Sequence, residues 1–168
     1  DGGLHNRIEG ASGADTLAGA GGIDAIFGGD GDDVIAGGLG NDSLQGKAGA
    51  DTFYWSFDAG RDTFNGGADV DTLNMMGAGV NEIAYANWNG ASLTGLWDNA
   101  FADAIEAINI DMSGGNDWHI YNTTFALTVN LALGTGSGFA SIANVERVIG
   151  GAGDDTLTGD GFDNRLEG

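Results

Sequence analysis

Apolar residues recur every nine positions along the first part of the chain. Cut into nines from Asp1, the sequence gives six units that end at Tyr54, and their eighth positions are Ile8, Leu17, Ile26, Ile35, Leu44 and Phe53. The register returns over residues 57–74 and again over 141–167. The last three residues of each unit predict a short strand that turns its eighth-position side chain into a core. The six small or polar residues before them predict a turn.

Two such units complete one coil of a solenoid, so each strand is expected to pair with the strand 18 residues away. Glycine reaches positive φ without steric cost, which allows a tight turn that aims backbone carbonyl groups inward. The second and fourth positions of the units supply such glycines, and these carbonyl groups are candidate metal ligands: Gly13, Gly22, Gly29, Gly31, Gly38, Gly40 and Gly49.

The sixth position of most units is acidic. Stacked coils bring these carboxylates to the strand spacing of about 4.8 Å, where they repel one another unless a cation lies between them. Oxygen ligands without nearby His or Cys suit calcium or magnesium, and a flexible cage of about six to eight oxygens favours calcium. We therefore expect several calcium ions, bound by the glycine carbonyl groups and by the carboxylates of Asp15, Asp24, Asp33, Asp42, Asp51, Asp62, Asp71 and Asp155.

The units GGDGDDVIA (28–36), GGLGNDSLQ (37–45) and GGAGDDTLT (150–158) resemble the nonapeptide of the RTX, or hemolysin-type calcium-binding, family. The resemblance implies an all-β fold, a parallel β-roll (right-handed β-solenoid), in secreted bacterial proteins. It also implies export by type I secretion and folding in extracellular calcium. The acid column departs from the pattern at Asn6, Glu146 and Asn164, and the glycine column departs at Leu4, Asp69, Asn144 and Phe162. Weaker calcium binding is expected in those coils.

The register fades between residues 75 and 140, where about half of the aromatic residues gather. We interpret 1–74 as calcium-binding roll, 75–140 as irregular, wider coils of the same domain, and 141–168 as roll resumed. Helical spacing of apolar residues predicts a short helix over 98–108, with Asp103 and Glu106 on a solvated face. Alternation predicts a strand over 125–133. Residues 108–122 predict a strand, a glycine turn and a strand, with Asp117 in a turn like those of the repeats.

The composition of the chain excludes several classes of function. The chain has 33 glycines, no proline and no cysteine, and 25 acids against 5 bases give a net charge of −20. This charge repels nucleic acid and anionic membrane surfaces and favours cations or basic partners. Without cysteine there is no disulfide framework or thiol nucleophile. Neither a membrane-spanning apolar run nor a leader peptide is visible. No nucleophile elbow occurs, and His119 is expected to be a surface or core residue, so no enzyme is expected.

These features together predict a calcium-dependent structural module of a secreted, extracellular or cell-surface protein, such as a segment of an adhesin, surface layer or filament. The alternative is a carbohydrate-binding module of a polysaccharide-modifying enzyme, with the central aromatic residues as its platform. Residues 5–10 closely resemble residues 163–168. This likeness predicts tandem modules or end-to-end self-association, unless it only reflects the shared repeat consensus.

Overall fold

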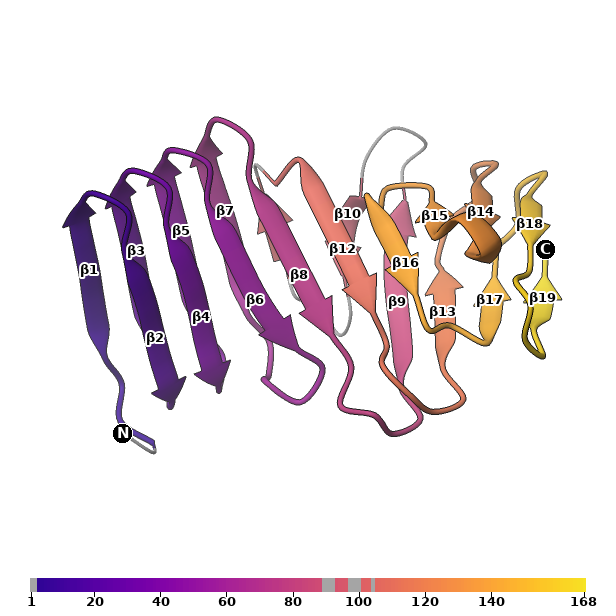
Figure 1. Cartoon of the computed structure of the whole chain (residues 1–168), viewed down its shortest axis with the longest axis horizontal. Coiled ribbons are helices and arrows are strands. Elements are labelled where there is room, and N and C mark those ends of the chain that lie inside the picture. The colour runs from indigo at the N-terminus through magenta and orange to yellow at the C-terminus, as the bar shows by residue number, and fades with distance from the viewer. Residues whose placement is uncertain (1–2, 89–92, 97–100, 104) are drawn as a thin grey trace. The chain divides into compact units, whose positions relative to one another are not determined.

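The computed structural model describes residues 3–88, 93–96, 101–103 and 105–168. Within these ranges the regular elements are β-strands and a 3-10 helix, η2 (Leu131–Leu133). The strands stack in parallel sheets, which confirms the all-β parallel β-roll (Figure 1). The chain forms two compact units: residues 1–75 with 100–108 (unit 1), and residues 76–99 with 109–168 (unit 2). In the part of the chain that is described, no helix has the length and apolar character needed to cross a bilayer.

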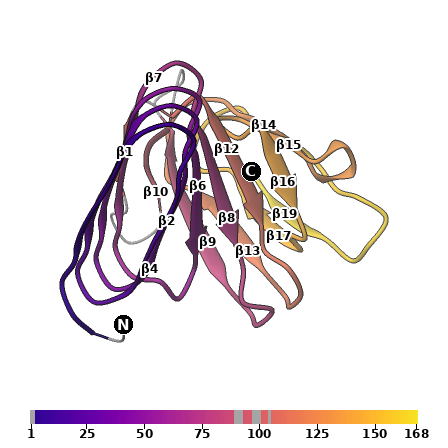
Figure 2. The same cartoon turned by 60° about the vertical axis from the view of Figure 1, so that its left-hand side comes forward.

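Unit 1 is built from two sheets that take alternate strands of the chain. The odd-numbered sheet follows the order β1 (Arg7–Ser12), β3 (Ala25–Asp30), β5 (Ser43–Ala48), β7 (Thr63–Ala68) and β11 (Phe101–Asp103). The even-numbered sheet follows the order β2 (Thr16–Gly21), β4 (Val34–Leu39), β6 (Thr52–Ser56) and β8 (Thr72–Met76). The chain thus passes from one sheet to the other at every turn, which Figure 2 shows as nested coils.

The register within unit 1 is that of two repeats per coil. Ile8 pairs with Ile26 and Ile26 pairs with Leu44, so successive partners are 18 residues apart. Leu44 then pairs with Phe64, because Trp55 and Ser56 are inserted between the regular units. The core is the column of eighth-position residues, and Phe53 packs edge-on against Phe64 with ring centroids 5.8 Å apart.

The strands of unit 1 are longer than the three residues predicted. β3, for example, covers six residues, from the seventh position of one repeat to the third position of the next. Side chains alternate along a strand, so Ile26 and Gly28 both face inward and are buried, whereas Phe27 is half-buried. The first position of each repeat is therefore part of the interior and not of the turn.

Unit 2 contains wider coils that narrow toward the C-terminal end. One sheet has the order β10 (Leu93–Leu96), β9 (Ile83–Trp88), β13 (Trp118–Tyr121), β17 (Arg147–Ile149) and β19 (Arg165–Glu167), and β10 is antiparallel to β9. From Asn109 onward, β12 (Ala107–Asp111) pairs with β16 (Ser141–Ala143). A third sheet has the order β15 (Thr135–Gly136), β14 (Thr128–Asn130) and β18 (Thr156–Thr158). The 18-residue spacing of regular coils returns between β17 and β19, where Val148 pairs with Leu166.

The helix predicted over 98–108 is wrong where the structure describes this segment. Phe101–Asp103 is strand β11, paired with β7, and β12 begins at Ala107. Residues 98–100 and 104 lie outside the described part. Ile108 and Ile110 are both buried, which is the alternation of a strand, and the Asp71 carbonyl accepts the Ala107 N–H at 3.0 Å. Pairing with neighbouring coils therefore outweighs the local helical spacing.

The strand predicted over 125–133 is correct only at Thr128–Asn130. The chain then bends into η2, where Asn130 Oδ1 accepts the Leu133 N–H at 3.0 Å and Gly134 ends the helix at φ 65°. Leu133 is consequently exposed, although Val129 is buried. The strand, turn and strand predicted over 108–122 are confirmed as β12 and β13. His119 is a core residue between the rings of Tyr121 and Phe139.

Candidate metal centre

The sixth-position acids of unit 1 form two ladders that run along the roll. In each ladder the side chain of one coil accepts a hydrogen bond from the backbone of the coil before it: Asp15 N–H donates to Asp33 Oδ1 at 2.8 Å. The same bond links Asp24 to Asp42 at 2.8 Å and Asp33 to Asp51 at 2.9 Å. One ladder comprises Asn6, Asp24, Asp42 and Asp62, and the other comprises Asp15, Asp33, Asp51 and Asp71. Acids of successive coils are thus brought side by side.

The second carboxylate oxygen of most ladder residues is buried and lacks a hydrogen-bond partner. This holds for Oδ2 of Asp15, Asp24, Asp33, Asp42, Asp51, Asp71 and Asp155. All of these acids except Asp71 are shown to lie against the glycine five residues earlier in their own repeats. A Cβ atom placed on Gly10 would be 2.6 Å from Asp15 Oδ2, and Gly19, Gly28, Gly37, Gly46 and Gly150 stand in the same relation to their acids. The first position is glycine because the carboxylate fills the space that a side chain would need.

The seven turn glycines predicted as carbonyl donors all have positive φ, from 96° at Gly38 to 135° at Gly40. All of them except Gly13 also pack directly onto the preceding coil. A Cβ atom on Gly31 would be 2.5 Å from the Gly13 carbonyl oxygen. The turns therefore stack closely enough that carbonyl oxygens of successive coils form rows beside the acid ladders.

The ladder continues through the irregular segment with glutamates. Glu106 Oε2 accepts the Asp71 N–H at 2.8 Å, so Glu106 is a ladder residue and not an acid on a helix face. Asp117 Oδ1 accepts the Glu82 N–H at 2.8 Å. In the last coils, Leu127 N–H donates to Asp155 Oδ1 at 3.2 Å. Asn164 leaves the pattern, because its Oδ1 accepts the N–H of Asp160 in its own repeat at 2.7 Å.

A further ladder at the fifth position was not predicted from the sequence. Its side chains accept from the coil that follows and not from the coil before: Asp32 Oδ1 accepts the Ala50 N–H at 2.8 Å. Asn41 accepts from Arg61 and Asn81 accepts from Asn116, each at 2.9 Å. The available signal was the Asp or Asn that precedes the sixth-position acid in GGDGDD, GGLGND and VNE. Each turn is therefore tied to both neighbouring coils.

Comparison with known families agrees with this geometry. The model of the RTX calcium-binding nonapeptide repeat matches four copies, at residues 9–44, 37–54, 58–74 and 146–168, which together cover just over half of the chain. The chain belongs to the RTX calcium-binding repeat family. A search of curated proteins finds no match. RTX repeats bind calcium and are typical of secreted bacterial proteins. The match identifies a repeat module and does not extend over residues 75–145.

The residues of this RTX module fit calcium. Buried carboxylate oxygens without partners are costly unless a cation or a donor compensates them. No group of three or more His, Cys, Asp or Glu side chains converges within the described ranges. An ion at the ladder would therefore draw mainly on backbone carbonyl oxygens, with few carboxylates. Such an all-oxygen, flexible donor set is what calcium prefers over transition metals.

In the absence of metal, burial raises the pKa of several ladder carboxyl groups, so these groups bind protons at higher pH than a free aspartate does. Burial raises the pKa of Asp51 to about 6, against a smaller opposing effect of the Asp33 N–H bond, and the neighbouring carboxylates of Asp71 and Asp33 raise it further. Burial likewise raises the pKa of Asp62 to about 6. The pKa values of Asp42 and Asp71 are also raised, again mainly by burial. Ionised ladder carboxylates thus destabilise the metal-free fold.

The metal-free RTX module is expected to be more stable in mild acid than at neutral pH. A carboxyl group whose pKa is raised in the folded state stabilises the fold fully below its ordinary pKa of 3.8, and this contribution is lost as pH rises through about 6 for Asp51 and Asp62. Protein stripped of metal should therefore show more strand signal by circular dichroism at pH 5 than at pH 7.5. Equal signals at the two pH values in metal-free buffer would contradict the expectation.

Three of the central aromatic residues that the structure describes, Trp118, Tyr121 and Phe139, pack against other side chains. Tyr121 and Phe139 belong to the core of unit 2, and the Arg147 guanidinium lies 3.7 Å from the centroid of the Trp118 ring. Phe125 is half exposed. The side chains of Tyr85, Trp88, Trp97 and Phe101 lie outside the described part. A saccharide platform in this segment therefore remains a prediction from sequence.

Proposed function

We propose that this RTX module is a calcium-dependent structural segment of a secreted bacterial protein, and that it folds when it meets extracellular calcium. The observation that carries the proposal is the ladder of buried carboxylates with unpartnered Oδ2 atoms. Asp33, Asp42 and Asp51 are each no more than 2% exposed, yet they lie on successive turns of a chain with a net charge of −20. Such a column requires positive charge that the five bases do not supply.

The chain itself supplies the scaffold on which the ion is held. Asp side chains use one oxygen to bind the backbone of the preceding coil, which orients the other oxygen toward the interior. The glycine at the first position leaves room for that oxygen, and the turn glycines bring carbonyl groups beside it. Calcium, when bound, supplies the positive charge and the coordination that these oxygens lack. Because ligands from different coils meet only in the folded chain, binding is coupled to folding.

Extracellular calcium modules bind with Kd of about 10⁻⁴ to 10⁻³ M. At such affinities the module would be without metal inside a cell and occupied outside it, which suits a chain exported before it folds. We propose a segment of an adhesin, surface layer or filament as its setting, because a stacked roll is a rigid spacer. Tandem or end-to-end association and binding of an extracellular polysaccharide remain predictions.

Equilibrium dialysis tests the proposed binding directly. At pH 7.5 and up to about 5 mM calcium, above the expected range of Kd, the chain should bind more than one ion, and magnesium should not replace calcium at equal concentration. Asp33→Asn and Asp42→Asn should each reduce the number of bound ions. The matched control is Asp30→Asn, which removes the same charge from an exposed position of the repeat that contains Asp33. Absence of calcium binding by the unaltered chain would overturn the proposal.

A further inference from the structure

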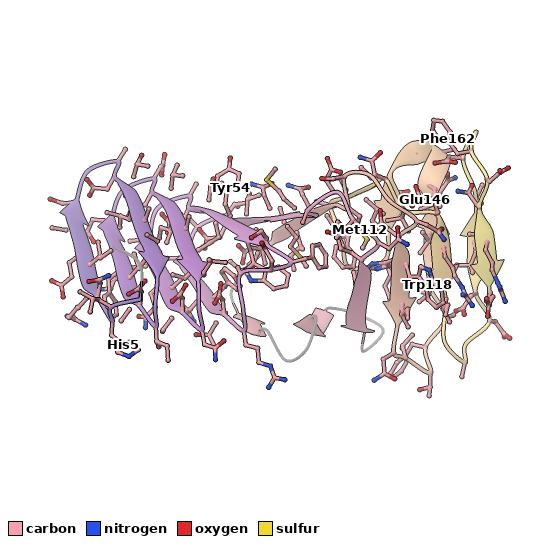
Figure 3. The ribbon with its side chains drawn as sticks, turned by 90° about the horizontal axis from the view of Figure 1, so that it is seen from below. His5, Tyr54, Met112, Trp118, Glu146 and Phe162 are labelled. Atoms are coloured by element: carbon pink, nitrogen blue, oxygen red, sulfur yellow. The ribbon has the colours of Figure 1, made fainter. Side chains whose placement is uncertain are left out.

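Unit 2 contains an acid row whose first two members, Glu82 and Asp117, lie outside the family match. Glu82 N–H donates to Asp117 Oδ1 at 2.8 Å, and Asp117 N–H donates to Glu146 Oε2 at 2.8 Å. The first two of these acids are 35 residues apart and the last two are 29 apart, so no nonapeptide period relates them. The family match ends at residue 74 and resumes at residue 146. Glu146 and the neighbouring Trp118 are labelled in Figure 3.

The turns that hold this row share two features with the nonapeptide turns, a glycine cradle at Glu82 and a close approach of a glycine to a carbonyl group of the preceding coil. Gly77 precedes Glu82 by five residues, and a Cβ atom on Gly77 would be 2.7 Å from Glu82 Oε2, as Gly10 is related to Asp15. Gly115 lies against the preceding coil, and a Cβ atom on Gly115 would be 2.5 Å from the Val80 carbonyl oxygen. Gly31 faces Gly13 in the same way at 2.5 Å. Both the first-position cradle and the stacked carbonyl groups are thus present.

Two buried oxygens in this row have no partner. Asp117 is fully buried and Glu82 is 8% exposed. Glu82 Oε1 accepts the Ala78 N–H at 2.5 Å, but Glu82 Oε2 has no hydrogen-bond partner. Asp117 Oδ1 accepts the Glu82 N–H, whereas Asp117 Oδ2 has no hydrogen-bond partner. Two carboxylates on adjacent turns therefore each present a buried, uncompensated oxygen.

We propose that Glu82 and Asp117 form a calcium site that lies outside the nonapeptide repeats. Its candidate ligands are Glu82 Oε2, Asp117 Oδ2 and the carbonyl oxygens of Val80 and Met112, which lie against the glycines of these turns. Glutamate takes the place of aspartate at residue 82, and its Oε1 accepts the N–H of Ala78 in its own turn, whereas the aspartates of unit 1 accept from the preceding coil. The site extends calcium binding into the irregular segment.

This inference rests on the proposed calcium binding of the RTX module, and the two can fail separately. Native mass spectrometry in calcium counts the ions bound to the unaltered chain and to Asp117→Asn and Glu82→Gln. Both substitutions keep the oxygen that accepts the backbone N–H and remove the charge. Each should lose one ion, whereas Asp154→Asn, an exposed acid of unit 2, should lose none. If the unaltered chain binds no ion, the proposed function fails; if it binds ions and neither variant loses one, only this site fails.

Terbium luminescence keeps the test decisive if the acid variants do not fold. Terbium replaces calcium at oxygen sites, and Trp118, directly after Asp117, can sensitise an ion bound there. Its ring is half-buried on the outer side of β13, so Trp118→Phe preserves the core. The substitution should lower the terbium emission excited through tryptophan and leave the number of bound calcium ions unchanged. Emission equal to that of the unaltered chain would overturn the site.

Discussion

Removal of calcium at pH 7.5 is expected to unfold most of the chain. The raised pKa values of Asp51 and Asp62 are about 6, so these two ladder carboxylates are ionised at this pH. Like charges then face one another across successive coils, and the glycine-rich turns add a large ordering entropy. Each independent site contributes about 1.4 kcal/mol at ten times its Kd, so four such sites contribute about 6 kcal/mol, which is comparable with the whole stability of a small domain.

Far-UV circular dichroism in EGTA, followed by millimolar calcium, measures this effect. The strand signal should be weak in EGTA and should appear cooperatively as calcium is added, and further EGTA should abolish it. Sodium chloride at the same concentration is the control. If calcium acted only by screening the carboxylate charges, sodium chloride would also restore the strand signal. A strand-rich spectrum in EGTA that calcium leaves unchanged would show that the folded state does not depend on the metal.

Gly28→Ala is expected to damage one rung of the ladder even in saturating calcium. An added Cβ atom would overlap Asp33 Oδ2 and would lie 2.8 Å from the Gly46 carbonyl oxygen, which belongs to the next coil. The backbone on both sides is held by sheet pairing, so the carboxylate must move away from its position. Overpacking of this kind costs about 1–3 kcal/mol, and loss of the ion held by Asp33 adds to it. We expect a decrease of about 2–3 kcal/mol in the free energy of unfolding by urea.

Gly161→Ala is the matched control for this substitution. Gly161 does not have positive φ, and an added Cβ atom there meets no atom within 4 Å. Its effect on unfolding should stay within about 0.5 kcal/mol. Calcium dialysis of the two variants separates the causes, since Gly28→Ala should lose bound calcium and Gly161→Ala should not. A Gly28→Ala protein with unchanged stability and unchanged calcium binding would show that the cradle is not needed.

The regular coils could be predicted from the sequence because their contacts repeat with the period of the chain. Ile26 and Leu44 occupy equivalent positions, so the same local pattern predicts both their burial and the pairing of their strands. The acid column follows from the same period. What the pattern does not contain is the direction of each carboxylate, so the bond from one side chain to the preceding backbone was not predicted.

The wider coils could not be predicted in the same way. Glu82 and Asp117 become neighbours only because a coil of 35 residues returns the chain to the same turn, and a nine-residue period gives no sign of that distance. Around Ile108 two patterns compete, since its spacing from Ile105 is helical and its spacing from Ile110 is that of a strand. Pairing with other coils decides between them, and those partners are distant in the sequence.

The ladders make the coil, and not the nonapeptide, the unit by which the module can change length. The sixth-position aspartates from Asp24 to Asp71 each bind the turn one full coil earlier, and strands alternate between the two sheets of unit 1. Loss or gain of 18 residues would leave each later acid facing an equivalent turn, whereas a step of nine would move every later strand to the opposite sheet. Trp55 and Ser56 show the other tolerated change: two extra residues widen one coil, and the bond from Asp42 to Asp62 still forms at 2.8 Å.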